Sequence, residues 1–370
     1  MSELFQSFQL GTMTLANRIV MAPMTRARSP LGIPNLLNAE YYQQRATAGL
    51  IVSEGIPISH EAQGFALIPG LWSYEQLQGW RDVTRHVHQA GGRIFAQLWH
   101  VGRLSHHTLQ PYGRAPVSAS AVTASPLYAK SFTYGSDGEL ALLPPDAPRA
   151  LEMHEIAELI KDYTDAARFA MDAGFDGVEI HAANGYLLEQ FLNPHTNQRT
   201  DIYGGTIRNR ARLIIEIISD VAAAIGSART AIRLSPGSQV FDMPFYPEWQ
   251  QTYQQLVAEL AHFKLAYLHL NDERRDGAAV LSDSYLASLK YHFQGPVILA
   301  GGMTKVKAEQ LISQQVIDLA AFGKPFIANP DLVARLQQDL PLTTPNTSTF
   351  YGGMAEGYTD YPVLNEKTYA

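Results

Sequence analysis

The chain lacks cysteine, a long apolar run and any cluster of basic residues. None of its 370 residues is Cys, which excludes disulfide bonds, iron–sulfur clusters and a thiol nucleophile. No stretch approaches the roughly 18 uninterrupted apolar residues of a membrane-spanning helix. The formal net charge of −7, without a lysine or arginine run, argues against nucleic acid or an anionic membrane as a partner. The N-terminus has no signal-peptide pattern, so we expect a cytoplasmic protein.

Short apolar runs rich in β-branched residues recur along the whole chain, and stretches of helical periodicity lie between most of them. The runs are residues 17–24, 50–56, 93–99, 177–181, 230–234, 266–270, 296–300 and 319–322. The clearest helical stretches are 152–173 and 208–225, each followed by a glycine. Eight such units in series predict an α/β fold, a (β/α)8 TIM barrel. An open doubly wound sheet is the alternative, but the GxGxxG turn expected after its first strand is missing.

Residues 101–150 interrupt this rhythm directly after the third predicted strand. They are rich in Pro, Ser, Ala, Tyr and Gly, and an insertion there falls on the face where barrels place their chemistry. We interpret the segment as a lid or side wall of a single domain that spans residues 1–370. A disordered excursion is the alternative, and the aromatic residues of the segment argue against it. The turn-rich segment 344–370 either packs over the barrel or trails from it.

The run His181-Ala182-Ala183-Asn184-Gly185-Tyr186 follows the fourth predicted strand. Two hydrogen-bonding side chains and a phenol therefore emerge together at the carboxyl end of a barrel strand. Two donors to one oxygen, beside an acidic O–H, suit a reaction that polarises a carbonyl or nitro group and protonates a carbon. The alternative is a polar helix cap with a buried tyrosine.

Glycines follow the seventh and eighth predicted strands, at Gly301, Gly302 and Gly323, and Lys324 comes next. Backbone N–H groups at these positions, before helix starts, predict a phosphate cradle to which Lys324 adds a cation. Two ordinary glycine turns and a solvated lysine are the alternative.

Two polar residues stand inside predicted strands. Arg233 needs a buried partner, either a structural carboxylate or an anionic cofactor ring. Gln97 either satisfies a backbone group or binds the edge of a heterocycle. The histidines show no metal-ligand spacing: His60, His86, His88, His106 and His269 are expected on the surface or in the core, and no acidic residue is spaced with His100 or His181. We therefore predict no metal site.

Six motifs are collinear with one known family. They are NRIVMAPMTR at 17–26, QLWHVGR at 97–103, HAANGY at 181–186, FLNP at 191–194, NQRTDIYGG at 197–205 and FIANPDL at 326–332. Over nearly its whole length the chain resembles the Old Yellow Enzyme family of FMN-dependent ene-reductases, in particular its bacterial members. Periodicity and composition indicate only a barrel with a phosphate site, whereas FMN and the reaction are implied by this resemblance.

The resemblance implies a two-step cycle in which NADPH or NADH reduces bound FMN and leaves. An α,β-unsaturated carbonyl, maleimide or nitroalkene then stacks over the flavin, and its oxygen accepts hydrogen bonds from His181 and Asn184. Flavin N5 delivers hydride to one carbon, and Tyr186 protonates the other. The implied partners are these electrophilic alkenes and the nicotinamide cofactor, with the protein a monomer or weak homo-oligomer.

The same resemblance assigns the remaining site residues. Thr25 matches the residue that hydrogen-bonds flavin O4, and Gln97 and Arg233 match those at the pyrimidine edge. The full cofactor-binding set is Pro23, Met24, Thr25, Gly55, Gln97, Arg233, Gly301, Gly302, Gly323 and Lys324. The substrate-binding set is His181, Asn184, Tyr186, Trp99, Phe65 and Tyr351.

Several positions depart from the family pattern. Lys324 replaces the usual arginine, which predicts weaker retention of FMN because lysine lacks the bidentate fork. Asn184 replaces a frequent second histidine, and Phe65 replaces a frequent tyrosine. The segment 271–277, with Arg274 and Arg275, follows no family pattern and is expected either as a solvated loop or near the phosphate of the nicotinamide cofactor. Alternatives of function are a reductase acting mainly on nitro compounds or nitrate esters, a flavin-free barrel such as an aldolase or metal-dependent hydrolase, and a non-catalytic flavin-binding module.

Overall fold

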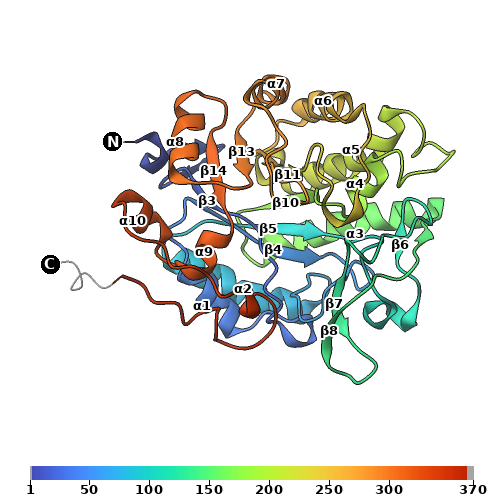
Figure 1. The fold of residues 1–370 in the computed structure, drawn as a ribbon, viewed down its shortest axis with the longest axis horizontal. Coiled ribbons are helices and arrows are strands. Elements are labelled where there is room, and N and C mark those ends of the chain that lie inside the picture. The colour runs from blue at the N-terminus through green and yellow to red at the C-terminus, as the bar shows by residue number, and fades with distance from the viewer. Residues whose placement is uncertain (1, 365–370) are drawn as a thin grey trace.

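A closed barrel of eight parallel strands forms the centre of the computed structural model, which describes residues 2–364 (Figure 1). The predicted (β/α)8 architecture is therefore confirmed. In order around the barrel the strands are β3 (Ile19–Met21), β4 (Leu50–Pro57), β5 (Ile94–Trp99), β10 (Gly177–Ala182), β11 (Thr230–Leu234), β12 (Leu268–Asn271), β13 (Val297–Ala300) and β14 (Leu319–Phe322). The first predicted strand is too long, and the sixth is displaced, because β12 ends at Asn271.

Helices follow the strands and surround the barrel (Figure 1). They are α1 (Leu36–Gln43), α2 (Tyr74–Gln89), α3 (Met153–Asp172), α4 (Leu187–Leu192), α5 (Ile207–Ile225), α6 (Trp249–Leu260), α7 (Asp283–Phe293), α8 (Lys305–Ser313), α9 (Lys324–Ala328) and α10 (Leu332–Gln337). The helices α3 and α5 match the predicted stretches to within one residue at each end. Their apolar side chains recur at helical spacing and are buried against the strands, while Glu152 and Thr206 cap their first turns.

The amino-terminal end of the barrel is closed by a hairpin of β1 (Phe8–Leu10) and β2 (Met13–Leu15). Its Leu10 and Leu15 are fully buried in the same apolar cluster as Val20, Phe95 and other residues of the barrel strands. A second, larger cluster fills the layer between the strands and the helices. With one end filled, the carboxyl ends of the strands are left to form a site.

The insertion 101–150 is structured. Strands β7 (Ser131–Tyr134) and β8 (Leu140–Leu143) form an antiparallel hairpin, and β6 (Val117–Ser118) pairs in parallel with β9 (Arg149–Ala150). The ring of Phe132 lies 5.9 Å from that of Tyr351, so the hairpin contacts the C-terminal segment. That the insertion acts as a lid over a substrate stays a prediction.

The described part of the C-terminal segment packs against the barrel, and residues 365–370 lie outside the described chain. Tyr358 is fully buried and stacks on Tyr41 at 4.0 Å. Arg26 and Arg28 donate hydrogen bonds to backbone carbonyls between residues 349 and 357.

Single-turn 3-10 helices occupy Glu3–Phe5, Pro30–Gly32, His107–Leu109, Pro111–Gly113, Ser227–Arg229, Val240–Asp242, Ala261–Phe263 and Thr347–Thr349. Within residues 2–364 every helix is too short or too polar to cross a membrane.

Candidate functional site

Two adjoining cavities lie at the carboxyl end of the barrel, with volumes of about 660 and about 70 Å³. Every residue predicted for the site lines one or both of them. The larger cavity includes Met24, Phe65, Gly301, Gly302, Gly323, Lys324 and Tyr351, the smaller includes Gly55, Gln97, Trp99 and His181, and both include Pro23, Thr25, Asn184, Tyr186 and Arg233. The fold therefore brings the predicted residues together, and their roles stay predictions.

The 181–186 turn presents three of its side chains to the cavities. Asn184 and Gly185 have φ angles of 57° and 78°, and asparagine is one of the few side chains that tolerates this left-handed conformation. The backbone N–H of Asn184 donates to Ser235 Oγ at 2.7 Å, and the backbone N–H of Gly185 donates to Glu189 Oε2 at 2.6 Å. These bonds fix the turn so that Tyr186, the N-cap residue of α4, faces the site.

Aromatic rings wall the smaller cavity. The Trp99 ring lies 4.7 Å from that of Tyr186, edge to face, and 6.2 Å from that of His181. Gly55 permits this arrangement, because a Cβ there would lie 2.3 Å from the Trp99 ring. The rings of Phe65 and Tyr351 lie 6.1 Å apart and continue the wall into the larger cavity.

Burial determines the protonation states of His181 and Tyr186 in the turn. It lowers the pKa of His181 well below its ordinary value, and the charges of Arg233 and His269 lower it further. The imidazole is therefore neutral at pH 7, and because Nδ1 accepts from the Ala183 N–H at 3.3 Å, Nε2 carries the proton. Burial also raises the pKa of Tyr186, so its phenol stays protonated. The turn thus offers neutral donors.

A buried hydrogen-bond network supports the floor of the smaller cavity. Glu179 accepts from Gln97 Nε2 at 2.7 Å and from His269 Nδ1 at 2.8 Å. One N–H of Gln97 is used in this contact, and its carbonyl oxygen remains to accept a hydrogen bond from a ligand. His269 and Glu179 do not line the cavity, and spacing along the chain could not have revealed their contact.

Arg233 points into both cavities, and its hydrogen bond goes to Asn271 rather than to a carboxylate. Nη2 donates to Asn271 Oδ1 at 3.1 Å, while the buried Nε has no partner among residues 2–364. No carboxylate within the described chain forms an ion pair with it. The charges of Glu179 and Glu273 still oppose the lowering of the Arg233 pKa by burial, so a structural role beside a carboxylate and a role beside an electron-rich ring both stay predictions.

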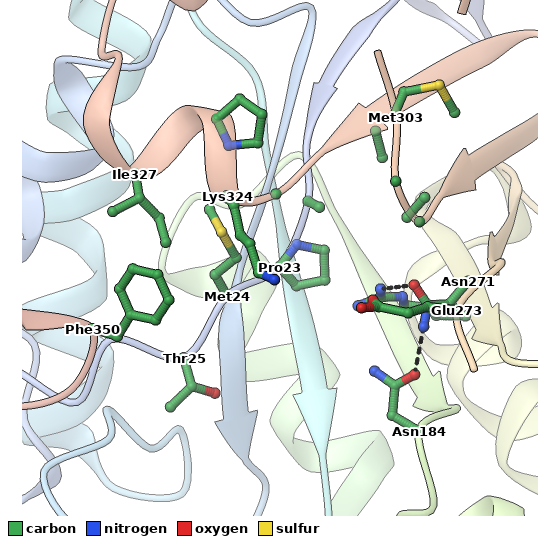
Figure 2. Close-up of a pocket in the computed structure, with 18 of the residues that line it drawn as sticks. Pro23, Met24, Thr25, Asn184, Asn271, Glu273, Met303, Lys324, Ile327 and Phe350 are labelled. Carbon is green, nitrogen blue, oxygen red and sulfur yellow. Dashed lines mark hydrogen bonds between the residues drawn. The ribbon is translucent and has the colours of Figure 1, made fainter. Parts of the chain in front are cut away.

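The glycine-rich end of the larger cavity has room for an anion. A Cβ at Gly302 would meet no described atom within 4 Å, and one at Gly323 would meet only Met24 Sδ at 3.7 Å and Ala22 Cβ at 4.0 Å. Lys324 extends its side chain from the start of α9 into this space (Figure 2). An acceptor amide, a guanidinium whose buried Nε has no partner among the described residues, and a glycine-lined end with a lysine together fit the FMN that the sequence resemblance implies.

The sequence interpretation assigned no site residue in the segment 271–277, but Asn271, Glu273 and Gly277 of that segment line the larger cavity. Asn271 forms hydrogen bonds with Arg233 and with Asn184, and Figure 2 shows its side chain above that of Asn184. The predicted strand ended one residue before it. The neighbouring arginines do not line either cavity: Arg274 pairs with Asp276, and Arg275 lies 3.7 Å from the ring centroid of Tyr128 in the insertion. A role for them near the nicotinamide cofactor stays a prediction.

The histidines are distributed mainly as expected. His269 and His100 are buried, and burial lowers the pKa of His100 to about 3. His106 and His107 meet Asp146 on the insertion, with possible ligand atoms within 4.8 Å of one another. This group was not visible in the sequence, because Asp146 lies far from the two histidines along the chain. It is partly exposed, and the prediction of no metal site stays a prediction.

Comparison with known proteins gives consistent results. The model of the NADH:flavin oxidoreductase / NADH oxidase family matches residues 3–343. A putative 12-oxophytodienoate reductase 11 of Oryza sativa subsp. japonica is 39% identical over 366 residues, covering 98% of this chain and 97% of its own. The 12-oxophytodienoate reductase 2 of Arabidopsis thaliana is 38% identical over 366 residues, covering 98% and 96%.

Solved structures agree over the whole fold. Morphinone reductase in complex with tetrahydroNAD has a TM-score of 0.95 and 44% identity, covering 100% of this chain and 99% of its own. An Old Yellow Enzyme homologue from Zymomonas mobilis has a TM-score of 0.92 and 40% identity, covering 98% and 100%. Together with the cavities, these matches show an FMN-dependent oxidoreductase that uses a nicotinamide cofactor. The chain belongs to the NADH:flavin oxidoreductase / NADH oxidase family and, within it, to the Old Yellow Enzyme type.

Proposed function

We propose that this protein is an ene-reductase, which reduces the activated C=C bond of α,β-unsaturated carbonyls, maleimides or nitroalkenes. The observation that carries the proposal is the convergence of His181, Asn184 and Tyr186 on one cavity. When bound, FMN supplies the hydride, which it receives from NADPH or NADH. The chain itself must bind both partners, polarise the substrate and provide a proton.

The cofactor-holding residues divide along the cavities. Gln97 and Arg233 would hold the pyrimidine edge of FMN, with Thr25 and Pro23 beside its ring. At the other end Gly301, Gly302, Gly323 and Lys324 would hold the phosphate. Lysine supplies a point charge rather than a fork, so Lys324→Arg should slow the release of FMN, as measured by flavin fluorescence after dilution.

The substrate oxygen accepts hydrogen bonds from His181 Nε2 and the Asn184 amide. Both donors are neutral and the turn holds their backbone in place, so they stabilise negative charge that develops on this oxygen with little reorganisation. By analogy with oxyanion donors, each is worth about 3 kcal/mol of barrier. Tyr186, kept protonated by burial, then gives its proton to the carbon that did not receive hydride.

The test is anaerobic spectroscopy of the purified protein. NADPH or NADH should bleach the flavin absorbance, and 2-cyclohexen-1-one should restore it. Tyr186→Phe should leave the bleaching step unchanged and slow the restoring step by about 10²–10⁴-fold, since only the second step needs the proton. The proposal is wrong if Tyr186→Phe and His181→Ala both restore the flavin at the wild-type rate with FMN bound.

Reduction of nitro compounds or nitrate esters is the second candidate. Two separate neutral donors, His181 and Asn184, can bind the two oxygens of one nitro group. Comparison of kcat/KM for an enone, a nitroalkene and a nitrate ester separates the two functions. The same assays with NADH and NADPH decide the nicotinamide preference.

A further inference from the structure

The side chain of Asn271 connects Arg233 to Asn184 through two hydrogen bonds (Figure 2). Arg233 Nη2 donates to Asn271 Oδ1 at 3.1 Å, and Asn271 Nδ2 donates to Asn184 Oδ1 at 3.0 Å. Asn271 is 6% exposed and Arg233 is 6% exposed, so water competes little for either bond. The three residues come from the ends of β12, β11 and β10.

The direction of this chain is fixed by Arg233. A guanidinium can only donate, so the group that faces it must be the oxygen of the Asn271 amide. The Asn271 nitrogen is then forced to face Asn184, and that nitrogen can only donate. Asn184 must therefore offer its own oxygen to Asn271, which leaves its Nδ2 as the group that faces a ligand in the cavity. An amide alone would have no such preference, because its two ends have the same shape.

The backbone of Asn184 is held independently of this chain. Its N–H donates to Ser235 Oγ at 2.7 Å, and its left-handed φ of 57° is part of the turn. What remains free is the rotation of the side-chain amide. The carboxylate next to Asn271 does not interfere, because Asp272 Oδ1 accepts from the backbone N–H groups of Val280 and Leu281 at 2.6 and 2.8 Å.

We propose that Asn271 is a positioning residue that keeps Asn184 a hydrogen-bond donor and so selects ligands with an acceptor oxygen at that place. The inference rests on the proposed function, in which Asn184 binds the substrate oxygen. It extends that function, because Arg233 and Asn271 together determine that Asn184 presents its N–H groups, and not its oxygen, to the cavity. A ligand that can present only an N–H donor there is rejected, because two donors would face each other.

Asn271→Asp is the sharpest variant, because it keeps an oxygen for Arg233 and reverses the hydrogen bond to Asn184, while it also adds a negative charge beside Arg233. A carboxylate accepts on both sides, so the Asn184 amide must turn its nitrogen toward it and its oxygen toward the cavity. Binding of 2-cyclohexen-1-one to the oxidised holoenzyme, measured by calorimetry without a reductant, should weaken more than tenfold. Asn271→Leu removes both bonds and leaves the amide free to rotate, so about a five-fold weakening is expected.

A double-mutant cycle distinguishes positioning from general support of the fold. In the Asn184→Ala background, Asn271→Leu and Asn271→Asp should have no further effect on the dissociation constant for 2-cyclohexen-1-one, because the amide they orient is absent. The inference is overturned if either substitution weakens binding equally in both backgrounds, or if Asn271→Asp binds the enone as the wild type does. If the wild-type holoenzyme neither binds nor reduces the enone, the proposed function itself fails, and the inference fails with it.

Discussion

Glu179 and Glu189 are both buried beside the 181–186 turn, yet their carboxyl groups meet opposite surroundings. Burial alone would raise the pKa of Glu179, but His269, Arg233 and the Gln97 amide hold it below its ordinary value. Burial raises the pKa of Glu189 to about 7, because its donors, Tyr253, Gly185 and Ser235, are all neutral. One carboxyl group is a fixed charge, and the other titrates near neutral pH.

The difference follows what each group supports. The floor around Glu179 orients Gln97 and lies near Arg233, so a permanent charge there suits the binding of a polar ring at any ordinary pH. The Glu189 carboxyl group only has to accept three hydrogen bonds that shape the turn, which a protonated carboxyl group does nearly as well as a charged one. Charge therefore lies under the proposed cofactor site, and neutral hydrogen bonds lie under the proposed substrate site.

The largest expected effect is that of Glu179→Gln. The substitution keeps the shape but removes the anion near Arg233, and it forces either Gln97 or His269 to reverse its hydrogen bond. Removing one member of a buried charged network costs about 3–5 kcal/mol, so the free energy of unfolding should fall by that order. Urea denaturation measures this loss, and the flavin-to-protein ratio after gel filtration should fall with it.

Glu189→Gln is the matched control, since it makes the same chemical change at a carboxyl group with neutral donors. Its amide oxygen can accept from Gly185 and Ser235, while its nitrogen faces the Tyr253 hydroxyl, which can accept. FMN retention should therefore stay close to the wild-type value. Equal loss of flavin in the two variants would show that the contrast between the carboxyl groups has no functional meaning.

The sequence could predict the elements that carry the site but not the contacts behind it. Eight apolar runs predicted the barrel, and strand ends predicted which side chains gather, because parallel strands present their carboxyl ends together. The contact of Glu179 with Gln97 depends on the register of β10 against β5, which no local pattern specifies. Asn271 was missed because strand boundaries are uncertain by a residue or more, and here the last residue of β12 is the one that we propose positions Asn184.

The free energy of unfolding should depend on pH through the Glu189 carboxyl group. The folded-state pKa of Glu189, about 7, lies above its ordinary value of 4.5, so the folded protein holds this proton more tightly than the unfolded chain. The resulting stability is fully present below pH 4.5 and is lost as the pH rises through 7. Each unit of pKa difference is worth about 1.4 kcal/mol, so the expected loss is a few kcal/mol.

Urea denaturation at a series of pH values between 4.5 and 8 measures this effect. In Glu189→Gln the free energy of unfolding should fall less steeply over this range than in the wild type. Part of the slope should remain, because burial also raises the pKa of Glu54 to about 7. Parallel curves for wild type and variant would contradict the assignment of a titrating carboxyl group beneath the turn.

The smallest effect is expected from two serines, Ser235 beside the 181–186 turn and Ser53 beside Gln97, which form equivalent hydrogen bonds. Ser235 Oγ accepts from the Asn184 N–H at 2.7 Å and donates to Glu189 Oε2 at 2.9 Å. Ser53 Oγ accepts from the Gln97 N–H at 3.0 Å and donates to the Glu54 carbonyl at 2.8 Å. Each serine therefore fixes the backbone of one ligand-facing amide, and Ser→Ala at either leaves a buried N–H without its partner, at a cost of about 1–3 kcal/mol.

Although both substitutions remove one hydroxyl group, we expect them to affect different steps of the proposed function. Ser235→Ala loosens Asn184, so KM for 2-cyclohexen-1-one should rise several-fold while the flavin content stays constant. Ser53→Ala loosens Gln97, so FMN should dissociate faster on dilution while KM of the FMN-saturated enzyme changes little. Steady-state kinetics at saturating FMN and flavin fluorescence after dilution measure the two quantities. If both serines alter both quantities alike, the two regions are one mechanical unit, and the division between a charged cofactor floor and a neutral substrate turn does not hold.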